Sequence, residues 1–333
     1  MLLMSKLKVG IIGGAGYTAG ELLRILIHHP AADIAFVQSE SNAGKPLSAV
    51  HTDLFFVKDM IFCKETNLKA DVIFLCKGHG ESYKLLEGEK IYAEAKIIDL
   101  SQDFRLKDDY STLQNKYGSF VYGLPELNRH IIKTSKNVAN PGCFATCLQL
   151  GMLPLFSKHL IQNDVHISAI TGSTGAGQKL TSTSHFSWRN NNMSVYKAFT
   201  HQHLKEVTQS LIQLDPSFDN SLFFIPYRGN FTRGIIATLY VKSEEPVEKA
   251  REYFTAYYED HPFVHVSDKN IDLKQVVNTN YCQLFVDKYE DTLMIISTID
   301  NLIKGASGQA VQNMNLMFGL KESMGLDLKS TAF

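Results

Sequence analysis

The start of the chain constrains the fold most, because an apolar run, a glycine-rich turn and a helical segment follow one another without a break. The run 7–12 (LKVGII) has the largely apolar character of a strand that is buried on both faces. The turn at 13–16 is GGAG, and 19–30 (AGELLRILIHHP) has the pattern of a helix that Pro30 ends. A strand that passes through a short turn into a helix begins a βαβ unit, so we expect a parallel sheet.

Later apolar runs extend this pattern and then change it. The segments 33–39 (DIAFVQS), 71–76 (DVIFLC) and 96–101 (KIIDLS) resemble further buried strands, separated by helical or polar stretches. After Ile167 strand-like runs dominate and fewer helices separate them, which indicates a second domain with a mixed sheet. Near the end, apolar residues between 302 and 318 recur at helical spacing and predict one closing helix.

Length, charge and cysteine content limit the classes of protein that fit. The chain has 333 residues, enough for two domains, and its formal net charge of -1 gives no reason to expect nucleic acid or an anionic membrane as a partner. No apolar run reaches the roughly 18 residues that span a bilayer. Five cysteines, an odd number in a long chain, do not resemble a disulfide framework and fit a reducing, cytoplasmic setting.

The glycine-rich turn also has the spacing of a dinucleotide-binding fingerprint. The run GAGYTA at 14–19 matches G-x-G-x-x-G/A, in which glycines let a pyrophosphate approach the N-terminus of the following helix. A turn that serves only backbone geometry is the alternative. After the second strand, Ser39, Ser41 and the nearby Lys45 could bind a ribose phosphate, whereas Glu40 could hold a free 2′-hydroxyl. These residues leave NAD and NADP open.

The sequence NPGC at 140–143 places a cysteine directly behind a turn. Pro141 cannot continue a strand, and Gly142 permits a sharp bend. The segment 143–156 (CFATCLQLGMLPLF) has helical spacing, so Cys143 is expected at a helix N-terminus. There the helix dipole and unpaired N–H groups lower the pKa of a thiol and can stabilise an oxyanion, which predicts a nucleophile. A buried small apolar side chain is the alternative.

A cysteine nucleophile needs a partner for proton transfer, and FTHQHLKEV at 199–207 offers one. His201 and His203 alternate there, and Glu206 could orient one of them, although surface histidines at a helix start give the same pattern. No cysteine pair with a third ligand lies at close spacing, so no metal site is predicted.

Two arginines and a second glycine-rich stretch complete the candidate site. The stretch 171–179 (TGSTGAGQK) follows an apolar strand and could form an anion-binding or nicotinamide-facing loop. Arg105 comes just after one predicted strand, and Arg233 starts another. The planar guanidinium fork suits a carboxylate or a phosphate, although a surface arginine is often only solvated.

A set of short motifs runs in order along nearly the whole chain, and as a set it resembles one family. The motifs are GGAGYTAGELL, SNAGK, DVIFLCKGHG, DLSQDFRL, YGLPELNR, NPGCFATC, GSTGAGQK, THQHLKE, GNFTRGI and DNLIKGASGQAVQ. They resemble the N-acetyl-gamma-glutamyl-phosphate reductases, which are relatives of aspartate-semialdehyde dehydrogenase. GYxxGEL, PGCxxT and HxH before an acid distinguish this family from its aspartate relative.

The resemblance implies an α/β protein with a Rossmann-type parallel-sheet domain and a central α+β mixed-sheet domain for substrate binding and dimerisation. It places the NADP-binding domain at 1–142 with 301–333, and the catalytic and oligomerisation domain at 143–300. It further implies NADPH as the coenzyme, a small-molecule acyl-phosphate substrate, and a homodimer or homotetramer.

The same resemblance assigns roles to the residues that match the family's motifs. Cys143 matches the catalytic cysteine and His201 the acid/base. The substrate-side positions are Arg105, His203, Glu206 and Arg233. The coenzyme-contact positions are Gly13, Gly16, Tyr17, Thr18, Ser39, Ser41, Gly175, Gly177 and Asn301. Thr174 and Gln178 depart from the family, which more often has serine and arginine there.

The implied reaction is the reduction of an N-acyl-gamma-glutamyl phosphate by NADPH to the 5-semialdehyde and phosphate, through a cysteine thioester, in arginine biosynthesis. Acetyl is the implied acyl group, with succinyl as the alternative. Three other functions remain open at this point. An aspartate-semialdehyde dehydrogenase would take a shorter substrate, a cysteine hydrolase would work without nicotinamide, and a sensor would bind NADPH without catalysis.

Overall fold

The computed structural model describes residues 5–57, 59–88, 90–107, 113 and 117–331. The chain divides into two compact units. Unit 1 consists of Met1–Pro141 and Ala306–Asp327, and unit 2 of Gly142–Gly305 and Leu328–Phe333. The predicted division after residue 142 lies one residue from the observed one. The chain re-enters unit 1 at Ala306 rather than at 301, and its last segment belongs to unit 2.

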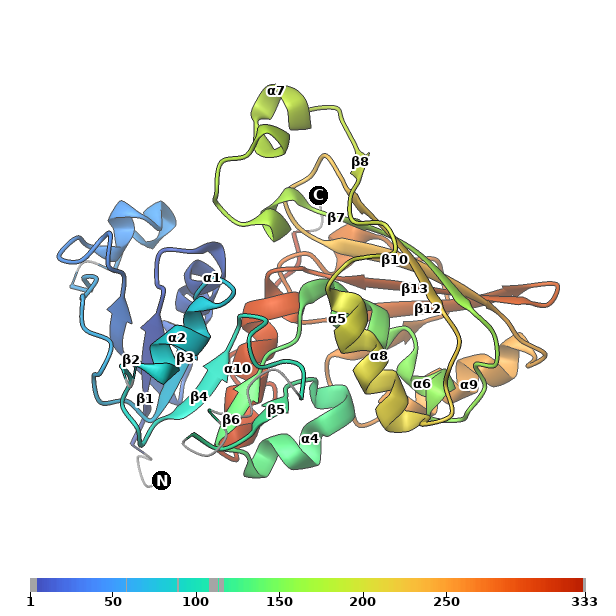
Figure 1. Ribbon diagram of the computed structural model, residues 1–333, viewed down its shortest axis with the longest axis horizontal. Coiled ribbons are helices and arrows are strands. Elements are labelled where there is room, and N and C mark those ends of the chain that lie inside the picture. The colour runs from blue at the N-terminus through green and yellow to red at the C-terminus, as the bar shows by residue number, and fades with distance from the viewer. Residues whose placement is uncertain (1–4, 58, 89, 108–112, 114–116, 332–333) are drawn as a thin grey trace. The chain divides into compact units, whose positions relative to one another are not determined.

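Unit 1 contains a six-stranded sheet in the order β2-β1-β3-β4-β6-β5 (Figure 1), and every pairing in it is parallel, as predicted. The strands are β1 (Leu7–Ile12), β2 (Ala32–Gln38), β3 (Val72–Leu75), β4 (Lys96–Asp99), β5 (Phe120–Tyr122) and β6 (Asn137–Ala139). The helices are α1 (Tyr17–Leu26), α2 (Glu81–Glu87), α4 (Pro125–Thr134) and α10 (Gly308–Met317).

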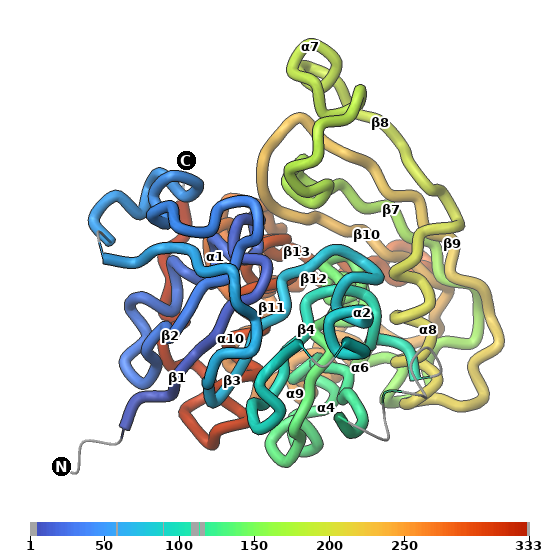
Figure 2. Tube along the Cα trace, turned by 60° about the vertical axis from the view of Figure 1, so that its left-hand side comes forward, coloured from blue at the N-terminus to red at the C-terminus, as the bar shows by residue number. Residues whose placement is uncertain are grey.

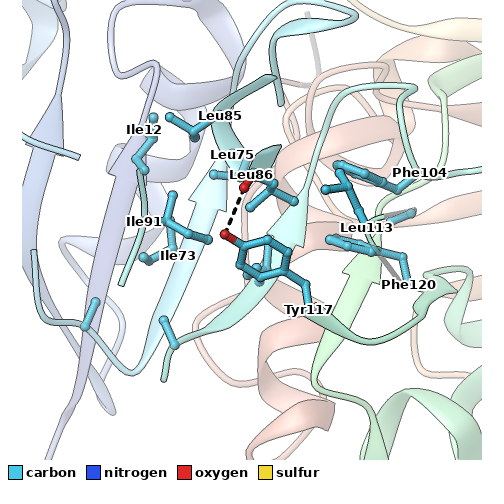
Figure 3. Packing of buried hydrophobic residues seen from close by; sticks show 14 of the residues in the cluster. Ile12, Ile73, Leu75, Leu85, Leu86, Ile91, Phe104, Leu113, Tyr117 and Phe120 are labelled. Carbon is cyan, nitrogen blue, oxygen red and sulfur yellow. Dashed lines mark hydrogen bonds between the residues drawn. The ribbon is translucent and has the colours of Figure 1, made fainter. Parts of the chain in front are cut away.

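Burial on both faces explains the continuous apolar runs of this sheet. Ile73 and Leu75 of β3 pack in one cluster with Leu86 of α2, where the Tyr117 hydroxyl donates to the Leu86 carbonyl oxygen at 2.9 Å (Figure 3). Phe74 points to the opposite face and is fully buried there. A strand covered on both faces has no position for a polar side chain, which matches its sequence VIFL.

The predicted closing helix forms in two parts. One turn of π-helix (Ile303–Ser307) comes first, and α10 follows it. The division between the units falls inside this turn. In unit 1, α10 lies against α1 and α4, and it is the red helix in Figure 2. Its polar residues are buried, and several of their side chains are hydrogen-bonded, as when the Asn313 amide nitrogen donates to the Gly123 carbonyl oxygen at 2.8 Å.

Unit 2 contains a seven-stranded mixed sheet in the order β11-β12-β13-β10-β7-β9-β8, which confirms the predicted mixed sheet. The pairs β7–β9 and β11–β12 are parallel, and the other pairs are antiparallel. The strands are β7 (Val165–Thr171), β8 (Ser194–Val195), β9 (Leu222–Arg228), β10 (Ile235–Lys242), β11 (Val264–Ser267), β12 (Cys282–Tyr289) and β13 (Thr292–Ile299). The helices are α5 (Cys143–Leu150), α6 (Leu153–Phe156), α7 (Phe186–Arg189), α8 (His203–Leu214) and α9 (Val247–Tyr258).

Helices cover one face of the mixed sheet (Figure 1). α5 packs on β10 and β13, and α9 packs on β11 and β12. Along β10 the side chains of Ala237 and Leu239 are buried, whereas Tyr240 is 41% exposed. Alternate residues of a strand point to opposite faces. The face of β10 turned away from α5 therefore presents partly exposed side chains.

The prediction of one helix over 143–156 is wrong in its middle. α5 ends at Leu150, Gly151 follows, and the short helix α6 begins at Leu153. Pro154 has no N–H to donate, so it is tolerated in the first turn of a new helix but not inside a continuous one. Within the described ranges, no helix combines the length and the apolar character that crossing a membrane requires.

Candidate active site

The turn between β1 and α1 has a backbone shape that requires glycine. Gly13 has a φ of +87°, and a Cβ there would lie 2.5 Å from the Cys76 carbonyl oxygen. The N–H groups of Gly13 and Gly14 both donate to the Gln38 carbonyl oxygen, at 3.1 and 2.7 Å. Gly16 precedes α1 and provides no side-chain cap. The turn therefore carries no side chain at Gly13, Gly14 or Gly16 that would cover the N-terminus of α1. An exposed helix N-terminus of this kind fits a pyrophosphate.

A polar cluster follows β2 in the same unit. Ser39 is buried and Ser41 is exposed, and the Asn42 amide donates to both hydroxyl oxygens, at 3.3 and 3.2 Å. Lys45 Nζ donates to the Asn42 side-chain oxygen at 3.3 Å. Two hydroxyls, an amide and an ammonium suit a phosphate. Asn42 is the member that the sequence did not single out, since its role depends on the turn that brings it back toward Ser39.

Unit 1 also holds three other predicted site residues. Tyr17 is 39% exposed at the start of α1, and the Thr18 carbonyl oxygen accepts from Ser307 Oγ at 2.8 Å. Arg105 is buried, and its Nε and Nη2 donate to the carbonyl oxygens of Asn140 and of the residue after β4, at 2.9 and 3.1 Å. Arg105 thus braces the backbone just before Pro141, and its contact with substrate stays a prediction.

Cys143 is the first residue of α5, which confirms its predicted position at a helix N-terminus. The side chain is half-buried. The Gly142 N–H donates to Oε2 of the buried Glu206 at 2.9 Å, so a carboxylate from α8 fixes the backbone directly before the cysteine. A Cβ at Gly305 would lie 2.8 Å from Cys143 Cβ. The cysteine is therefore held from two sides by residues distant in sequence.

The two predicted histidines lie together next to this helix start. The rings of His201 and His203 are 4.7 Å apart, and that of Phe144 is 5.3 Å from His201. The His203 backbone N–H donates to His201 Nδ1 at 3.3 Å, and His203 Nε2 lies 3.9 Å from Glu206 Oε1. Burial, followed by the electrostatic effects of the nearby His203 and Lys197, lowers the pKa of His201 to about 3. His201 is therefore neutral at physiological pH.

Two further side chains of unit 2 join this group, and sequence reasoning missed both. The Tyr196 ring lies 5.7 Å from the His201 ring, and the Arg228 guanidinium carbon lies 4.6 Å from the centre of the Tyr196 ring. Burial, and then the proximity of Cys143, raises the pKa of Tyr196 to about 12. The signal for Arg228 was its place at the end of a strand-like run, FFIPYR, beside GNFTRGI.

Arg233 and the second glycine-rich stretch form a separate network in unit 2. Arg233 Nε and Nη2 pair with the two carboxylate oxygens of Asp300, at 3.0 and 3.3 Å. Asp300 also accepts from the backbone N–H groups of Asn278, Leu302 and Ile303, at 2.7, 2.7 and 3.0 Å. The Nε and Nη2 groups of Arg233 are thus already hydrogen-bonded to the buried Asp300. Substrate binding by Arg233 stays a prediction.

Asn301 connects the loop after β7 to the residues around Arg233 and Asp300 through two hydrogen bonds. Its Oδ1 accepts from the Gly234 N–H at 2.7 Å, and its Nδ2 donates to Thr174 Oγ1 at 3.0 Å. Thr174 opens the loop that contains Gly175 and Gly177, and Gly177 has a φ of +74°. The structure thus brings Asn301 and the glycine loop together within unit 2, and their contact with the coenzyme stays a prediction.

Comparison with known proteins places both units in one class. Residues 8–135 match the family described as semialdehyde dehydrogenase, NAD binding domain, and 143–301 match semialdehyde dehydrogenase, dimerisation domain. The N-acetyl-gamma-glutamyl-phosphate reductase of Bacteroides fragilis is 58% identical over 330 residues, which cover 98% of this chain and 100% of that protein. The enzyme of that name from Phocaeicola vulgatus is 56% identical over 329 residues, with the same coverage.

Solved structures show the same fold. Aspartate semialdehyde dehydrogenase II from Vibrio cholerae matches 95% of this chain and 99% of its own with a TM-score of 0.73 at 17% identity. Aspartate semialdehyde dehydrogenase from Candida albicans, solved with NADP, matches 94% of this chain and 99% of its own with a TM-score of 0.70 at 14% identity.

The fold and the two matched domains define a semialdehyde dehydrogenase, an oxidoreductase with a domain for a nicotinamide dinucleotide. Within this class, the identities over the full length show that the chain belongs to the N-acetyl-gamma-glutamyl-phosphate reductase family. The aspartate-semialdehyde dehydrogenases share its fold at much lower identity.

Proposed function

We propose that the chain reduces an N-acyl-gamma-glutamyl phosphate with NADPH to the N-acyl-glutamate 5-semialdehyde and phosphate, a step of arginine biosynthesis. Relatives named for this activity match it from end to end. The observation that carries the proposal lies within unit 2, where Cys143 begins α5 beside a neutral His201 and a buried Glu206. A nucleophile at a helix start, with an imidazole near it, is the arrangement that a thioester mechanism needs.

The first chemical step joins the Cys143 sulfur to the acyl carbon and breaks the bond from that carbon to the phosphate oxygen. Phosphate leaves, and the acyl group remains as a thioester. The positive end of the α5 dipole favours the thiolate, and the amide N–H groups of the first turn stabilise the oxyanion. All five cysteines are free, so the Cys143 thiol is available as a nucleophile.

The residues present fit NADPH, which when bound supplies the hydride that reduces the thioester. A Cβ at Gly13 would lie 2.5 Å from the Cys76 carbonyl oxygen, and one at Gly14 would lie 2.3 Å from the Val37 side chain, so the turn itself requires glycine at both positions. At Gly16, before α1, no atom of the described residues, its chain neighbours aside, lies within 4 Å of the Cβ position, which leaves room for a pyrophosphate at the helix N-terminus. The cluster of Ser39, Ser41 and Lys45 would hold a 2′-phosphate, which favours NADPH over NADH. In unit 2, Asn301 and the loop it bonds would face the nicotinamide.

His201 acts on the substrate oxygen as a hydrogen-bond donor. Its Nδ1 accepts the His203 N–H, so the neutral ring carries its proton on Nε2. A neutral imidazole can stabilise the oxyanion left by hydride addition through this hydrogen bond while keeping its proton. Collapse of that oxyanion forms the aldehyde carbonyl, breaks the carbon–sulfur bond and returns the thiolate. His203 and Glu206 hold this ring and the backbone before Cys143 in place.

The buried neutral state of His201 makes the fold sensitive to acid. Its pKa is about 3 in the folded protein against an ordinary value of 6.5, because burial penalises its charge. Between these values the unfolded chain binds a proton that the folded one excludes. The free energy of unfolding therefore falls as the pH drops below 6.5, by at most roughly 1.4 kcal/mol per pH unit from this group. Urea unfolding at pH 7 and pH 5 should show a smaller loss in His201→Gln than in the wild type. Equal losses would assign the effect to other groups, such as the buried His29.

The reverse reaction tests the function directly. Purified protein with NADP+, phosphate and N-acetylglutamate semialdehyde should form NADPH, and omission of phosphate should stop it. N-succinylglutamate semialdehyde, run in parallel, reports the acyl preference. Faster turnover of aspartate semialdehyde would instead favour the shorter substrate, and release of product without any nicotinamide would favour a hydrolase.

We further propose that a second copy of the chain covers the open face of the mixed sheet. His166, Phe223 and Tyr240 form an aromatic stack there, with ring separations of 5.1 and 5.5 Å, and Tyr240 is 41% exposed. The domain that carries this sheet matches a family described by its dimerisation. A two-fold axis through such a face would pair the same patch from both copies.

A charge on this face should separate the copies. Tyr240→Glu would bury a carboxylate in an apolar contact, so the dimer dissociation constant should rise by roughly 100-fold or more. Sedimentation velocity over a range of concentrations measures it. Ile212→Glu is the matched control, because Ile212 is 42% exposed on α8, on the helical side of the sheet. Equal dissociation in both variants, or none in either, would place the interface elsewhere.

A further inference from the structure

Arg228 ends β9 in unit 2, and its guanidinium lies among the side chains of the candidate site. Its Cζ is 4.6 Å from the centre of the Tyr196 ring, and that ring is 5.7 Å from the His201 ring. The Arg228 charge acts on both: it adds to the burial that lowers the pKa of His201 and opposes the burial that raises that of Tyr196. Arg228 therefore contacts an aromatic ring that itself lies against His201.

Several arginines of the described chain are paired with a carboxylate. Arg233 pairs with Asp300 and Arg24 with Asp53. Across the described ranges, no ion pair joins Arg228 to a carboxylate, and its Nε is buried with no hydrogen-bond partner. A partly buried guanidinium is unfavourable without an anion, and a site for an acyl phosphate must bind anions. The unmatched charge indicates that the substrate supplies the partner.

The fold holds the backbone of Arg228 in place, and its guanidinium lies over an aromatic ring. Arg228 pairs with Thr171 on one side of β9 and with Ser194 on the other, and its carbonyl oxygen accepts from Arg189 Nη1 at 3.0 Å. The Arg228 guanidinium carbon lies over the Tyr196 ring, and this cation–π contact favours one position of the side chain. A guanidinium that is already in position before binding loses little conformational freedom when it binds a carboxylate through both oxygens.

We propose that Arg228 binds a carboxylate of the substrate and so places the acyl phosphate against Cys143. This inference rests on the proposed function and specifies the ligand of the same site. The carboxylate has two possible sources: the α-carboxylate of the glutamyl group, or a carboxylate at the end of the acyl group, as in N-succinyl substrates. Both present the same planar anion to the guanidinium fork.

Kinetics of the reverse reaction separate these sources. Arg228→Leu removes the charge, and kcat/KM for the semialdehyde should fall by about 10- to 100-fold, the value of a charge-assisted hydrogen-bond pair. A loss with both the N-acetyl and the N-succinyl semialdehydes assigns the α-carboxylate. A loss with the N-succinyl substrate alone assigns the acyl carboxylate. In either case KM for phosphate and NADP+ should stay unchanged, and Arg228→Lys should recover part of the loss.

Controls distinguish a binding role from a structural one. Arg251→Leu removes an arginine of α9 that bonds Val286 and Asp287 of β12, and should leave kcat/KM for both semialdehydes unchanged. Calorimetric titration with N-acetylglutamate and N-succinylglutamate measures carboxylate binding without turnover. It therefore tests the role of Arg228 even if the wild type turns over neither semialdehyde. Unchanged binding and kcat/KM in Arg228→Leu, or a rise confined to KM for phosphate, would overturn the proposal.

Discussion

Replacing Cys143 with serine should lower kcat by roughly 1000-fold or more, because a serine hydroxyl stays protonated where a thiol can ionise and forms no thioester. The change removes one sulfur at the first residue of α5 and keeps the backbone contacts of Gly142 with Glu206. NADP+ should therefore bind as in the wild type. Phosphate-dependent NADPH formation measures the loss, and coenzyme fluorescence titration measures binding.

Cys147→Ser is the matched control for this loss. Cys147 lies one turn further along the same helix, fully buried, with its Sγ 3.4 Å from the Ser297 carbonyl oxygen. Burial raises the pKa of Cys147 well above its usual range, so it is a packing residue and not a nucleophile. Its variant should keep its kcat while its melting temperature falls. Near-normal turnover in Cys143→Ser would exclude the thioester route.

The features that sequence predicted well are those fixed by local patterns. The apolar run at β1, the turn that follows it and the start of α5 at Cys143 each depend on a few consecutive residues. Glycine at 13 is required by the positive φ of the turn itself. A parallel sheet follows from the alternation of such strands with helices, so β1 to β4 could be predicted before any tertiary contact was known. The strands β5 and β6 have three residues each and are too short to stand out in the sequence.

The contacts that complete the site depend on strand register, which no short motif contains. The antiparallel pairing of Ile235 with Ile299 brings Arg233 to Asp300, so its guanidinium meets an acid of the protein itself. The pairing of Arg228 with Ser194 places it near Tyr196. The sequence can show that Arg228 ends one strand-like run and that Arg233 precedes the next. Only the strand register shows which of the two arginines has a carboxylate partner.

The contact between Gly305 and Cys143 gives the second large expected effect. Gly305 lies in the π-helical turn before α10, and a Cβ added there would lie 2.8 Å from Cys143 Cβ and 3.2 Å from its Cα. These atoms belong to the start of a helix and cannot swing aside as the end of a long side chain can. Gly305→Ala should therefore displace the nucleophile by a few tenths of an ångström or more, and kcat should fall by roughly 100-fold.

Gly151→Ala provides the comparison at the other end of α5. A Cβ there would lie 3.0 Å from Leu239 Cδ1, the movable end of a side chain, so this variant should keep its kcat. In Gly305→Ala the dissociation constant for NADP+ should stay unchanged while alkylation of Cys143 by iodoacetamide slows, since the sulfur leaves its place at the helix start. Parallel losses of coenzyme binding and thermal stability would mean that the π-helical turn acts only in folding. A selective loss of kcat and thiol reactivity would show that Gly305 positions the nucleophile, because the absent side chain is what allows the turn to pack directly on Cys143.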